Sequence, residues 1–529
     1  MRYDLIIRNG IIVDGSGSPP FRGDVGIVGD VIRSVKDLSG IDAESVINAK
    51  DLVIAPGFID IHNHSDISIF EVPTADNYIL QGVTTIVIGN CGSSPAPLTD
   101  VNKAEYVSMI KKVHDVNVTW TSFSEYLESL ERLKPSINIA PLVGHGTVRS
   151  AVLGYEDIKP SDKDLGAMKE LIKEAMEAGA FGMSTGLIYV PSMFGDTREI
   201  IELSKIVAKF GGLYATHMRN EGIGLVDSVI EALTIGLSSG AGVEISHLKA
   251  SGRPSWGKVN IALDLISEYA SRGYDVSADA YPYEASSTSL TAVLPKELKR
   301  GSSEEIMKKL LDPAVLKDLK KRLSSVAIEE RFIPWLDIMI AYSLKHKEFE
   351  GLRITQIAER LGLDPVEVVV RLLLDDELST QMIIFGMREE DVDKVISHPL
   401  VAIGSDESVK KYGIGKPHPR GYGTFPRIIS KYVREKKLIS LPEAIRKMTS
   451  LPSRKLGLWD RGLIRPGFKA DLVVFNYNTV NDTATYENPH SYPKGIIWVV
   501  LNGKIVAEDG TVLKDSRYGR VLRKTILLR

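Results

Sequence analysis

The middle of the chain alternates short apolar segments with amphipathic helical stretches, and this alternation restricts the fold more than any other feature. A helical pattern separates most of the apolar segments, as in residues 161–180, where Ser161 is a suitable N-cap and apolar residues recur on one face. Eight strands separated by helices predict an α/β fold, a closed (β/α)8 barrel rather than an open sheet. The eight expected strands are residues 53–62, 84–91, 137–146, 182–187, 212–218, 243–248, 274–283 and 400–407.

Both ends of the chain have a different pattern, with short β-branched runs broken by Gly, Asn and Asp. We expect hairpin turns at Asn9-Gly10, Gly29-Asp30 and Asn502-Gly503. Because chain ends often lie close together, the two ends predict one small β-sandwich domain. The expected domains are residues 1–53 and 461–529, which form the two parts of the β-sandwich, and residues 54–460, which form the barrel.

One interval between expected strands is too long for a single barrel helix. Residues 284–398 separate the seventh and eighth strands and contain helical patterns without an obvious barrel strand. We interpret them as a helical insertion after strand seven that covers the barrel mouth. A chain of 529 residues with 43% hydrophobic residues is large and apolar enough for such a barrel with an accessory lobe.

Composition excludes several classes of function. Lys and Arg number 65 against 68 Asp and Glu, so the net charge of −3 favours neither nucleic acid nor acidic lipid as a partner. We find no secretory signal pattern, no stretch of ~18 apolar residues for a membrane helix, and no phosphate-loop motif. The single cysteine, Cys91, excludes an internal disulfide. We therefore expect a cytoplasmic protein with a small-molecule substrate, and the sequence leaves the oligomeric state open.

Residues that can bind metal occur where the expected strands end. The C-terminal ends of barrel strands converge on one rim, where barrel active sites lie. Imidazole, thiolate and carboxylate together suit zinc, and the cysteine favours zinc over other divalent ions. Each residue alone is more often structural, but their coincidence at the strand ends predicts a metal centre. The candidate ligands are His62, His64, Cys91, His217, His247 and Asp406.

Several segments also resemble a known family. APGFIDIHNHSD (55–66) resembles the strand-one signature of the amidohydrolase superfamily, and GLIRPGFKADLVVF (462–475) its return into the β-sandwich. Within that superfamily the chain resembles the N-acyl-D-amino-acid deacylases, or D-aminoacylases, in colinear order from about residue 3 to 510. The motifs are NCGSSPAP (90–97), GLIYVP (186–191), THMRNE (216–221), ISHLK (245–249), DAYPYEASST (279–288), IGSDE (403–407) and HPRGYGTFPR (418–427).

The resemblance implies a division of the ligands between two metal positions. Cys91, His217 and His247 are expected to hold one tightly bound zinc. A second, weaker divalent metal is expected at His62, His64 and Asp406. Many relatives bridge two metals with a carboxylated lysine at strand four, but residues 182–187 contain none, so Cys91 takes the bridging place. This departure favours the D-aminoacylases over dihydroorotases, hydantoinases and ureases.

The implied reaction is hydrolysis of N-acyl-D-amino acids to a carboxylate and a free D-amino acid. Zinc makes hydroxide available at neutral pH for attack on the amide carbonyl. Asp406 is expected to act as general base and then as general acid toward the leaving nitrogen. The expected substrate-binding residues are Arg420 for the free carboxylate, with Lys249, Tyr281, Ser287 and Tyr189 around the amino acid.

Other interpretations stay open at this point. A D-dipeptidase or a cyclic-amide hydrolase of the dihydroorotase or hydantoinase type would use a related site, and a non-catalytic barrel scaffold would have lost ligands. Stereoselectivity follows only from the resemblance, and the substrate side chain is not determined. His145 ends a strand without matching a ligand position, so we expect it beside the ligands or at the barrel mouth. Asp60 and Asp66 flank the His-x-His pair and are expected to orient the imidazoles by hydrogen bonds.

Overall fold

A computed structural model describes residues 2–525 and contains all eight expected barrel strands in sequence order. The strands are parallel and form two sheets, ordered β6-β7-β8 and β17-β13-β12-β11-β10-β9. The third strand is divided at Leu142 into β8 and β9. The bounds are β6 (Phe58–Asp60), β7 (Val83–Ile88), β8 (Asn138–Pro141), β9 (Val143–Gly144), β10 (Gly182–Gly186), β11 (Leu213–His217), β12 (Gly242–Ile245), β13 (Val276–Ala280) and β17 (Val401–Ile403).

The first and eighth strands meet just beyond their carboxyl ends. Backbone N–H of Asp406 donates to the carbonyl of His62 at 2.8 Å, and N–H of His64 donates to the carbonyl of Glu407 at 2.9 Å. Asn63 and Glu407 form a parallel bridge between these hydrogen bonds. The prediction of a (β/α)8 barrel is confirmed, and the contact that joins its first and last strands lies among the candidate ligands.

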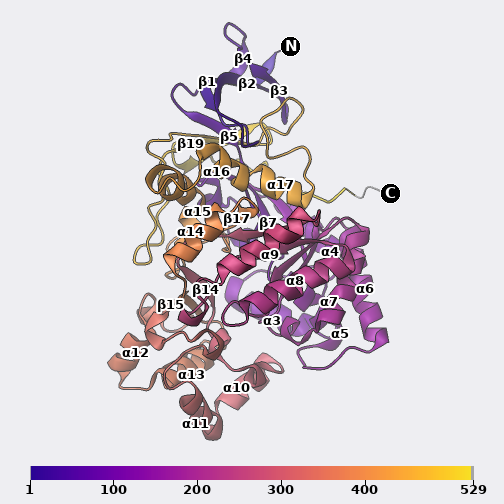
Figure 1. Ribbon diagram of the computed structural model, residues 1–529, viewed down its shortest axis with the longest axis vertical. Coiled ribbons are helices and arrows are strands. Elements are labelled where there is room, and N and C mark those ends of the chain that lie inside the picture. Colours follow the sequence, from indigo (N-terminus) through magenta and orange to yellow (C-terminus); the bar gives the residue numbers. More distant parts are fainter. Residues whose placement is uncertain (1, 526–529) are drawn as a thin grey trace.

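Helices follow the strands and cover the outside of the barrel (Figure 1). Ser161 caps α6 as expected, because its hydroxyl accepts from the N–H of Asp164 and that carboxylate accepts from the N–H of Ser161. Among residues 2–525, no helix is both long and apolar enough to cross a membrane. The barrel helices are α1 (Ser68–Glu71), α2 (Asp76–Ile79), α3 (Lys103–His114), α4 (Phe123–Leu133), α5 (His145–Leu153), α6 (Asp162–Glu177), α7 (Thr197–Lys209), α8 (Leu225–Ser239), α9 (Val259–Ser271), α14 (Glu389–Ser397), α15 (Arg420–Arg427), α16 (Leu441–Met448) and α17 (Ser450–Leu456), with a π-helix, η8 (Ile428–Glu435), after α15.

The two ends of the chain share one nine-stranded sheet. It lies at one end of the molecule, where indigo N-terminal strands meet the yellow C-terminal segment (Figure 1). The ends join where β5 pairs antiparallel with β18, and Leu5, Ile27 and Val500 belong to one buried apolar cluster. The strands are β1 (Tyr3–Ile12), β2 (Phe21–Val28), β3 (Val31–Lys36), β4 (Ala43–Asn48), β5 (Val53–Pro56), β18 (Leu472–Phe475), β19 (Ile496–Leu501), β20 (Lys504–Glu508) and β21 (Thr511–Val512).

The hairpin expected at Asn9-Gly10 is wrong, whereas those at Gly29-Asp30 and Asn502-Gly503 are confirmed by the pairs β2–β3 and β19–β20. β1 continues through Asn9, which takes a φ of 63° in a bulge where the register with β2 shifts. A Cβ atom at Gly10 would lie 2.3 Å from Cδ1 of Ile54. Asn9-Gly10 therefore forms a bulge, and the missing side chain at Gly10 leaves room for the side chain of Ile54.

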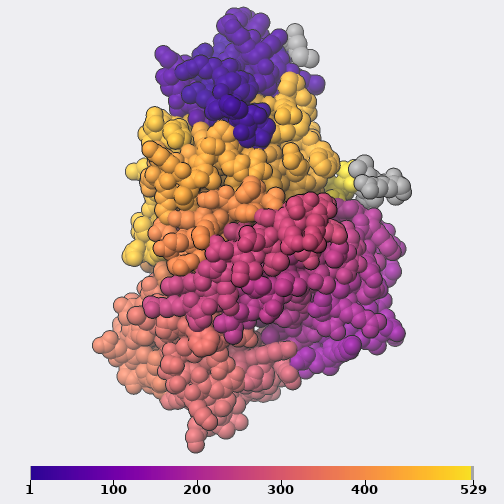
Figure 2. All heavy atoms as spheres, in the orientation of Figure 1, coloured from indigo at the N-terminus to yellow at the C-terminus, as the bar shows by residue number. Residues whose placement is uncertain are grey.

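The insertion forms a lobe with its own apolar core, which borders the barrel opposite the terminal sheet (Figures 1 and 2). Besides helices it contains a three-stranded antiparallel sheet of order β14-β16-β15. The sequence did not predict this sheet, because short apolar runs such as IMIAY resemble buried helix as much as strand. Its elements include β14 (Ala285–Ser289), β15 (Ile338–Tyr342), β16 (Gln381–Phe385), α10 (Ser303–Leu310), α11 (Pro313–Arg322), α12 (Ile354–Leu361), α13 (Pro365–Asp375) and the short 3-10 helix η5 (Glu329–Arg331).

Candidate metal centre and active site

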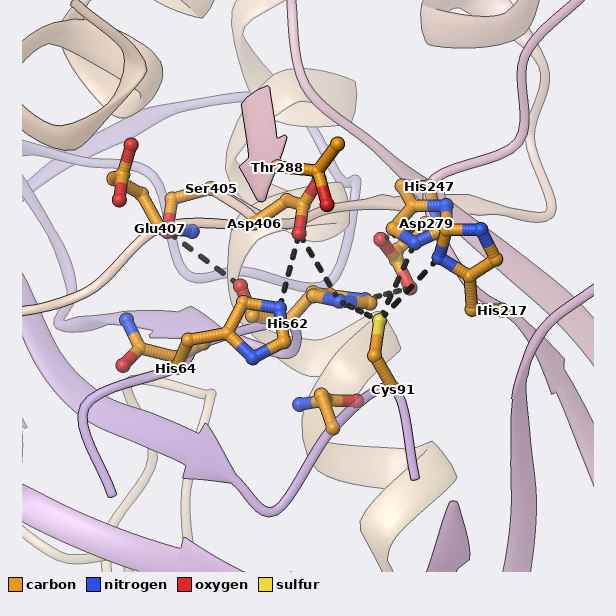
Figure 3. Close-up of polar contacts among 12 residues, drawn as sticks. His62, His64, Cys91, His217, His247, Asp279, Thr288, Ser405, Asp406 and Glu407 are labelled. Atoms are coloured by element: carbon orange, nitrogen blue, oxygen red, sulfur yellow. Dashed lines mark hydrogen bonds and ion pairs between the residues drawn. The ribbon is translucent and has the colours of Figure 1, made fainter. Parts of the chain in front are cut away.

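The six predicted ligands lie together at the carboxyl ends of the barrel strands (Figure 3). Their donor atoms form two groups, and within each group all of these atoms lie within 4.8 Å of one another. Cys91 belongs to both groups, so its sulfur stands where a ligand shared by two metals would stand. The first group is His62, His64, Cys91 and Asp406, and the second is Cys91, His217 and His247.

The distances around Cys91 fit a zinc ion. Its Sγ atom lies 3.4 Å from Nε2 of His62, 3.4 Å from Nε2 of His247 and 3.7 Å from Nδ1 of His217. A tetrahedral zinc with Zn–S bonds of about 2.3 Å and Zn–N bonds of about 2.0 Å separates sulfur from nitrogen by about 3.5 Å. The donor atoms of the second group are therefore already spaced for one zinc ion.

Three of the candidate ligands adopt a backbone conformation that is unusual for residues with a side chain. The φ angles of Cys91, His247 and Asp406 are 51°, 38° and 53°. Non-glycine residues in this left-handed region are strained, and such residues cluster at functional sites. Their backbones are held by hydrogen bonds, for example from N–H of His247 to Oδ1 of Asp279 at 2.9 Å. All three residues stand two or three positions after the end of a barrel strand, where the chain leaves the sheet.

Asp406 lies between two histidines and an arginine. Its Oδ1 lies 3.1 Å from Nε2 of His64 and 3.4 Å from Nε2 of His62, and its Oδ2 accepts from Nη1 of Arg420 at 2.8 Å. Burial alone would raise the pKa of this carboxyl, but Arg420 and the neighbouring histidines hold the pKa well below its usual range. Asp406 is therefore ionised at neutral pH and can accept a proton or bind a cation.

The pKa of the Cys91 thiol is shifted upward, opposite to that of Asp406. Burial, together with the nearby Asp406 carboxylate, raises the pKa of Cys91 well above its usual range. The thiol keeps its proton until a cation arrives, because a bound metal supplies the positive charge that stabilises a thiolate.

Two buried carboxylates that the sequence reasoning did not select complete the centre. Oδ2 of Asp279 lies 3.3 Å from Nδ1 of His62. Oε1 of Glu221 lies 2.9 Å from Nδ1 of His247. Both residues fall inside motifs of the resemblance, THMRNE and DAYPYEASST, but only the folded chain shows that they face ligand imidazoles. Buried carboxylates of this kind fix the orientation of metal-binding histidines.

The two aspartates that flank His-x-His do not contact the imidazole rings in the way expected. Asp60 accepts from N–H and Oγ of Ser405 at 2.8 and 2.6 Å and from Nδ2 of Asn63, so it ties the first strand to the eighth. Burial raises the pKa of Asp60 to about 7. Burial also raises the pKa of Asp66 to about 6, against the opposing charge of His64.

His145 is part of a buried ionic network outside the metal centre. It begins α5, and its ring nitrogens lie 2.7 Å from Oγ of Ser192 and 2.8 Å from Oε1 of Glu199. The other oxygen of Glu199 accepts from Nη1 of Arg149 at 2.5 Å. His145, Arg149 and Glu199 are all buried. This network stabilises the barrel beneath α5 and α7 and supplies no ligand atom.

Glu199→Gln should therefore lower stability without releasing metal. The substitution leaves the buried Arg149 guanidinium without its ionic partner, and breaking a buried pair costs about 3–5 kcal/mol in the free energy of unfolding. Urea denaturation measures the stability, and the zinc content of the folded variant should equal that of the wild type. A loss of zinc from folded protein would place Glu199 in the metal centre after all.

The predicted substrate residues surround the centre on two sides. The Arg420 guanidinium stacks 4.5 Å from the Tyr281 ring, and Nη2 donates to the carbonyl of Ser287 at 3.3 Å. Within residues 2–525 the buried Tyr281 hydroxyl has no hydrogen-bond partner. The Ser287 hydroxyl instead donates to the carbonyl of Met382 at 3.0 Å.

On the other side, the Tyr189 ring lies edge-on to His217 at 5.2 Å, and its hydroxyl is 2.8 Å from Oγ1 of Thr288. The Lys249 side chain lies beside His247, with Nζ 2.7 Å from Nδ1 of that ring. Nζ also donates to Oε1 of Glu221 at 2.6 Å, so Lys249 is already paired. Its role toward the substrate stays a prediction.

Comparison with known proteins agrees with this site. The model of the amidohydrolase family matches residues 45–209 and 327–507. The chain is 35% identical to an N-acyl-D-glutamate deacylase of Alcaligenes xylosoxydans xylosoxydans, over 99% of this chain and 97% of the relative. The N-acyl-D-glutamate deacylase of Bordetella bronchiseptica, solved with zinc and a phosphonate mimic of the tetrahedral intermediate, superposes with a TM-score of 0.85 at 32% identity, covering 99% of this chain and 100% of that one.

A D-aminoacylase structure, described with a binuclear metal centre in which one metal activates and a second attenuates, has a TM-score of 0.82 at 35% identity and covers 98% of this chain and 100% of its own. These similarities extend over nearly the whole length of both partners, and the predicted ligands lie together as a metal centre requires. The chain belongs to the amidohydrolase family, in its branch of N-acyl-D-amino-acid deacylases.

Proposed function

We propose that this protein is a zinc-dependent hydrolase that converts N-acyl-D-amino acids into a carboxylate and a free D-amino acid. The observation that carries the proposal is the joint placement of the zinc-spaced Cys91 cluster, the ionised Asp406 and the stacked Arg420 on one rim. Its relatives' substrates are small molecules, and the near-balanced charge of the chain accords with such a substrate. A cytoplasmic location stays a prediction.

Cys91, His217 and His247 would hold the tightly bound zinc, and His62, His64 and Asp406, sharing Cys91, a second and weaker metal. A bound zinc supplies Lewis acidity for the amide carbonyl and lowers the pKa of a coordinated water to about 7. The group of Cys91, His217 and His247 contains a thiol and two buried imidazoles, whereas His64 in the other group is partly exposed. This difference in ligand type and burial supports the assignment of the stronger site to Cys91, His217 and His247.

Asp406 would move the proton that hydrolysis requires. An ionised carboxylate at the mouth can accept a proton from the attacking water at Oδ1 and deliver it to the leaving nitrogen, which cannot depart as an anion. Arg420 holds the other oxygen, Oδ2, at 2.8 Å and so fixes the direction in which Oδ1 points. Arg420 would thus orient Asp406 and also bind the substrate carboxylate.

Arg420→Lys should raise KM for N-acyl-D-amino acids by about 100-fold. The reason is that a charge-assisted bidentate pair between the guanidinium and the substrate carboxylate contributes roughly 2–3 kcal/mol to the free energy of binding. Arg427→Lys is the matched control, because Arg427 stacks 4.6 Å from Tyr283 just as Arg420 stacks 4.5 Å from Tyr281. Steady-state kinetics are measured for both variants on an N-acyl-D-amino acid and on the analogue whose free carboxylate is replaced by a carboxamide. An unchanged preference for the free carboxylate in Arg420→Lys would remove Arg420 from substrate binding.

The proposed function is tested by product release from paired N-acetyl-D-methionine and N-acetyl-L-methionine, with zinc measured on the same sample. We expect release from the D substrate alone and zinc at one or two ions per chain. Zinc without release from either compound would contradict the deacylase assignment and favour the alternative of a D-dipeptide or a cyclic amide, each assayed next. A scaffold without catalysis would hydrolyse none of these compounds.

A further inference from the structure

Glu221 lies at the centre of a charged cluster behind the metal ligands. It follows β11 by four residues, and its side chain is 1% exposed. Oε1 lies 2.6 Å from Nζ of Lys249 and 2.9 Å from Nδ1 of His247. Oε2 lies 3.3 Å from Nη2 of Arg331 and 3.6 Å from Nε2 of His217. A single buried carboxylate thus faces the outer nitrogens of both histidines of the Cys91 cluster.

The nitrogens that face Glu221 are the ones that carry protons when the histidines bind metal. Nδ1 of His217 and Nε2 of His247 point at the Cys91 sulfur, so these two nitrogens are the metal-binding ones. A neutral imidazole that binds metal through one nitrogen carries its proton on the other. His217 would then present Nε2–H, and His247 Nδ1–H, both toward Glu221.

Lys249 makes an acceptor at this position necessary. Its Nζ lies only 2.7 Å from Nδ1 of His247. When that nitrogen carries a proton, the ammonium and the imidazole are two donors in contact, and Oε1 of Glu221 is within reach of both. Without Glu221 the ammonium would instead donate to Nδ1, which places the imidazole proton on Nε2, where the metal should bind.

Arg331 brings the insertion into the same cluster. It belongs to η5 and reaches Glu221 from outside the barrel sequence. The insertion approaches closely here, because a Cβ atom at Gly252, whose φ is 89°, would lie 1.6 Å from the carbonyl oxygen of Arg331. Lys249 pairs with one oxygen of Glu221 and Arg331 with the other, so each oxygen of this buried carboxylate faces a cationic side chain.

We propose that Glu221 is the positioning residue that selects the metal-binding tautomer of His247 from 2.9 Å and favours that of His217 through its charge from 3.6 Å, where among residues 2–525 the His217 Nε2 atom has no hydrogen-bond partner, and that Arg331 of the insertion holds the second oxygen of Glu221 in place. The inference rests on the metal centre of the proposed function but not on the identity of the substrate. Glu221 touches no reacting atom in this account and acts only through the two imidazoles.

Glu221→Gln tests the proposal. An amide carries N–H donors at one end, so it puts a donor either against Lys249 and His247 or against Arg331 and His217. We expect zinc affinity, measured by competition with a chelator, to fall by about 10- to 100-fold, the range for residues that support metal ligands. The absorption bands of the cobalt-substituted protein should shift as well. Glu199→Gln is the control, since that carboxylate also pairs with a buried histidine and arginine but contacts no ligand.

Every outcome of the experiments on Glu221→Gln and Arg331→Gln either supports or overturns the positioning role of Glu221. A folded Glu221→Gln protein with wild-type zinc affinity and an unchanged cobalt spectrum would overturn the proposal. If this variant does not fold, Arg331→Gln decides, because Arg331 contacts Glu221 from the insertion without touching a ligand. Weaker zinc binding by Arg331→Gln supports the proposal, and wild-type binding overturns it. A wild-type protein that binds no zinc would overturn both this inference and the proposed metal centre, whereas zinc binding without deacylase activity would overturn the proposed substrate alone.

Discussion

Asp406→Asn is expected to lower kcat for N-acyl-D-amino acids by about 10²- to 10⁴-fold, the contribution of a positioned general acid–base group, while the protein keeps zinc at the Cys91 cluster. The amide cannot accept a proton from water or pass one to the leaving nitrogen. Zinc should stay because Cys91, His217 and His247 form a complete group of donors without Asp406. Turnover and zinc content are measured on the same preparation.

Asp482→Asn is the matched control for this substitution. Asp482 also accepts from an arginine at 2.8 Å, and its side chain is 10% exposed against 11% for Asp406. The control therefore removes the same charge from an equally buried aspartate that pairs with an arginine outside the centre, and its kcat should stay near that of the wild type. Similar losses of kcat in both variants would show that the Asp406 effect is structural, and wild-type turnover by Asp406→Asn would exclude it as the proton carrier.

Cys91→Ala is expected to have the second large effect, loss of zinc together with activity. The sulfur lies in both groups of donors, so its removal leaves two histidines in one group and weakens the other. A metal contributes several kcal/mol of transition-state stabilisation, and at about 1.4 kcal/mol per tenfold this predicts a fall in kcat/KM of roughly 1,000-fold. The measurement is metal content after dialysis, followed by turnover.

Excess zinc serves as the internal control for Cys91→Ala. If the thiolate only strengthens binding, turnover should recover as zinc is added; if it also positions the ion, the fully loaded variant should stay slow. A dialysed Cys91→Ala protein with wild-type zinc content and turnover would contradict the role of Cys91 in either form.

The proximity of the candidate ligands could be predicted from the sequence because a barrel places all strand ends on one rim. His62, Cys91, His217 and Asp406 each follow a recognisable apolar segment, and the rule of barrel rims converts that position into proximity. These inferences needed only local patterns and one rule of topology.

The partners of the ligands could not be predicted in this way. Arg331 and Glu221 are 110 positions apart, and their contact depends on how the insertion seats against the loop at Gly252. Asp279 faces His62 only because the seventh and first strands lie near each other in the closed ring. Like the candidate ligands, His145 stands at the end of a short apolar segment of the sequence. However, α5 begins at this residue, and its ring contacts Glu199 instead of the metal centre. Asn9-Gly10 likewise carries the residues of a hairpin but lies in a bulge.

Titration of zinc into the metal-free enzyme, with turnover of N-acetyl-D-methionine followed at each addition, would show whether the Cys91 cluster holds the metal that catalysis needs. We expect an inactive metal-free protein whose activity rises in proportion to zinc and reaches its maximum near one ion per chain, because the Cys91 cluster fills before the His62 and His64 position. Full activity before any zinc is added, or no activity with the Cys91 cluster filled, would contradict this role of the Cys91 cluster.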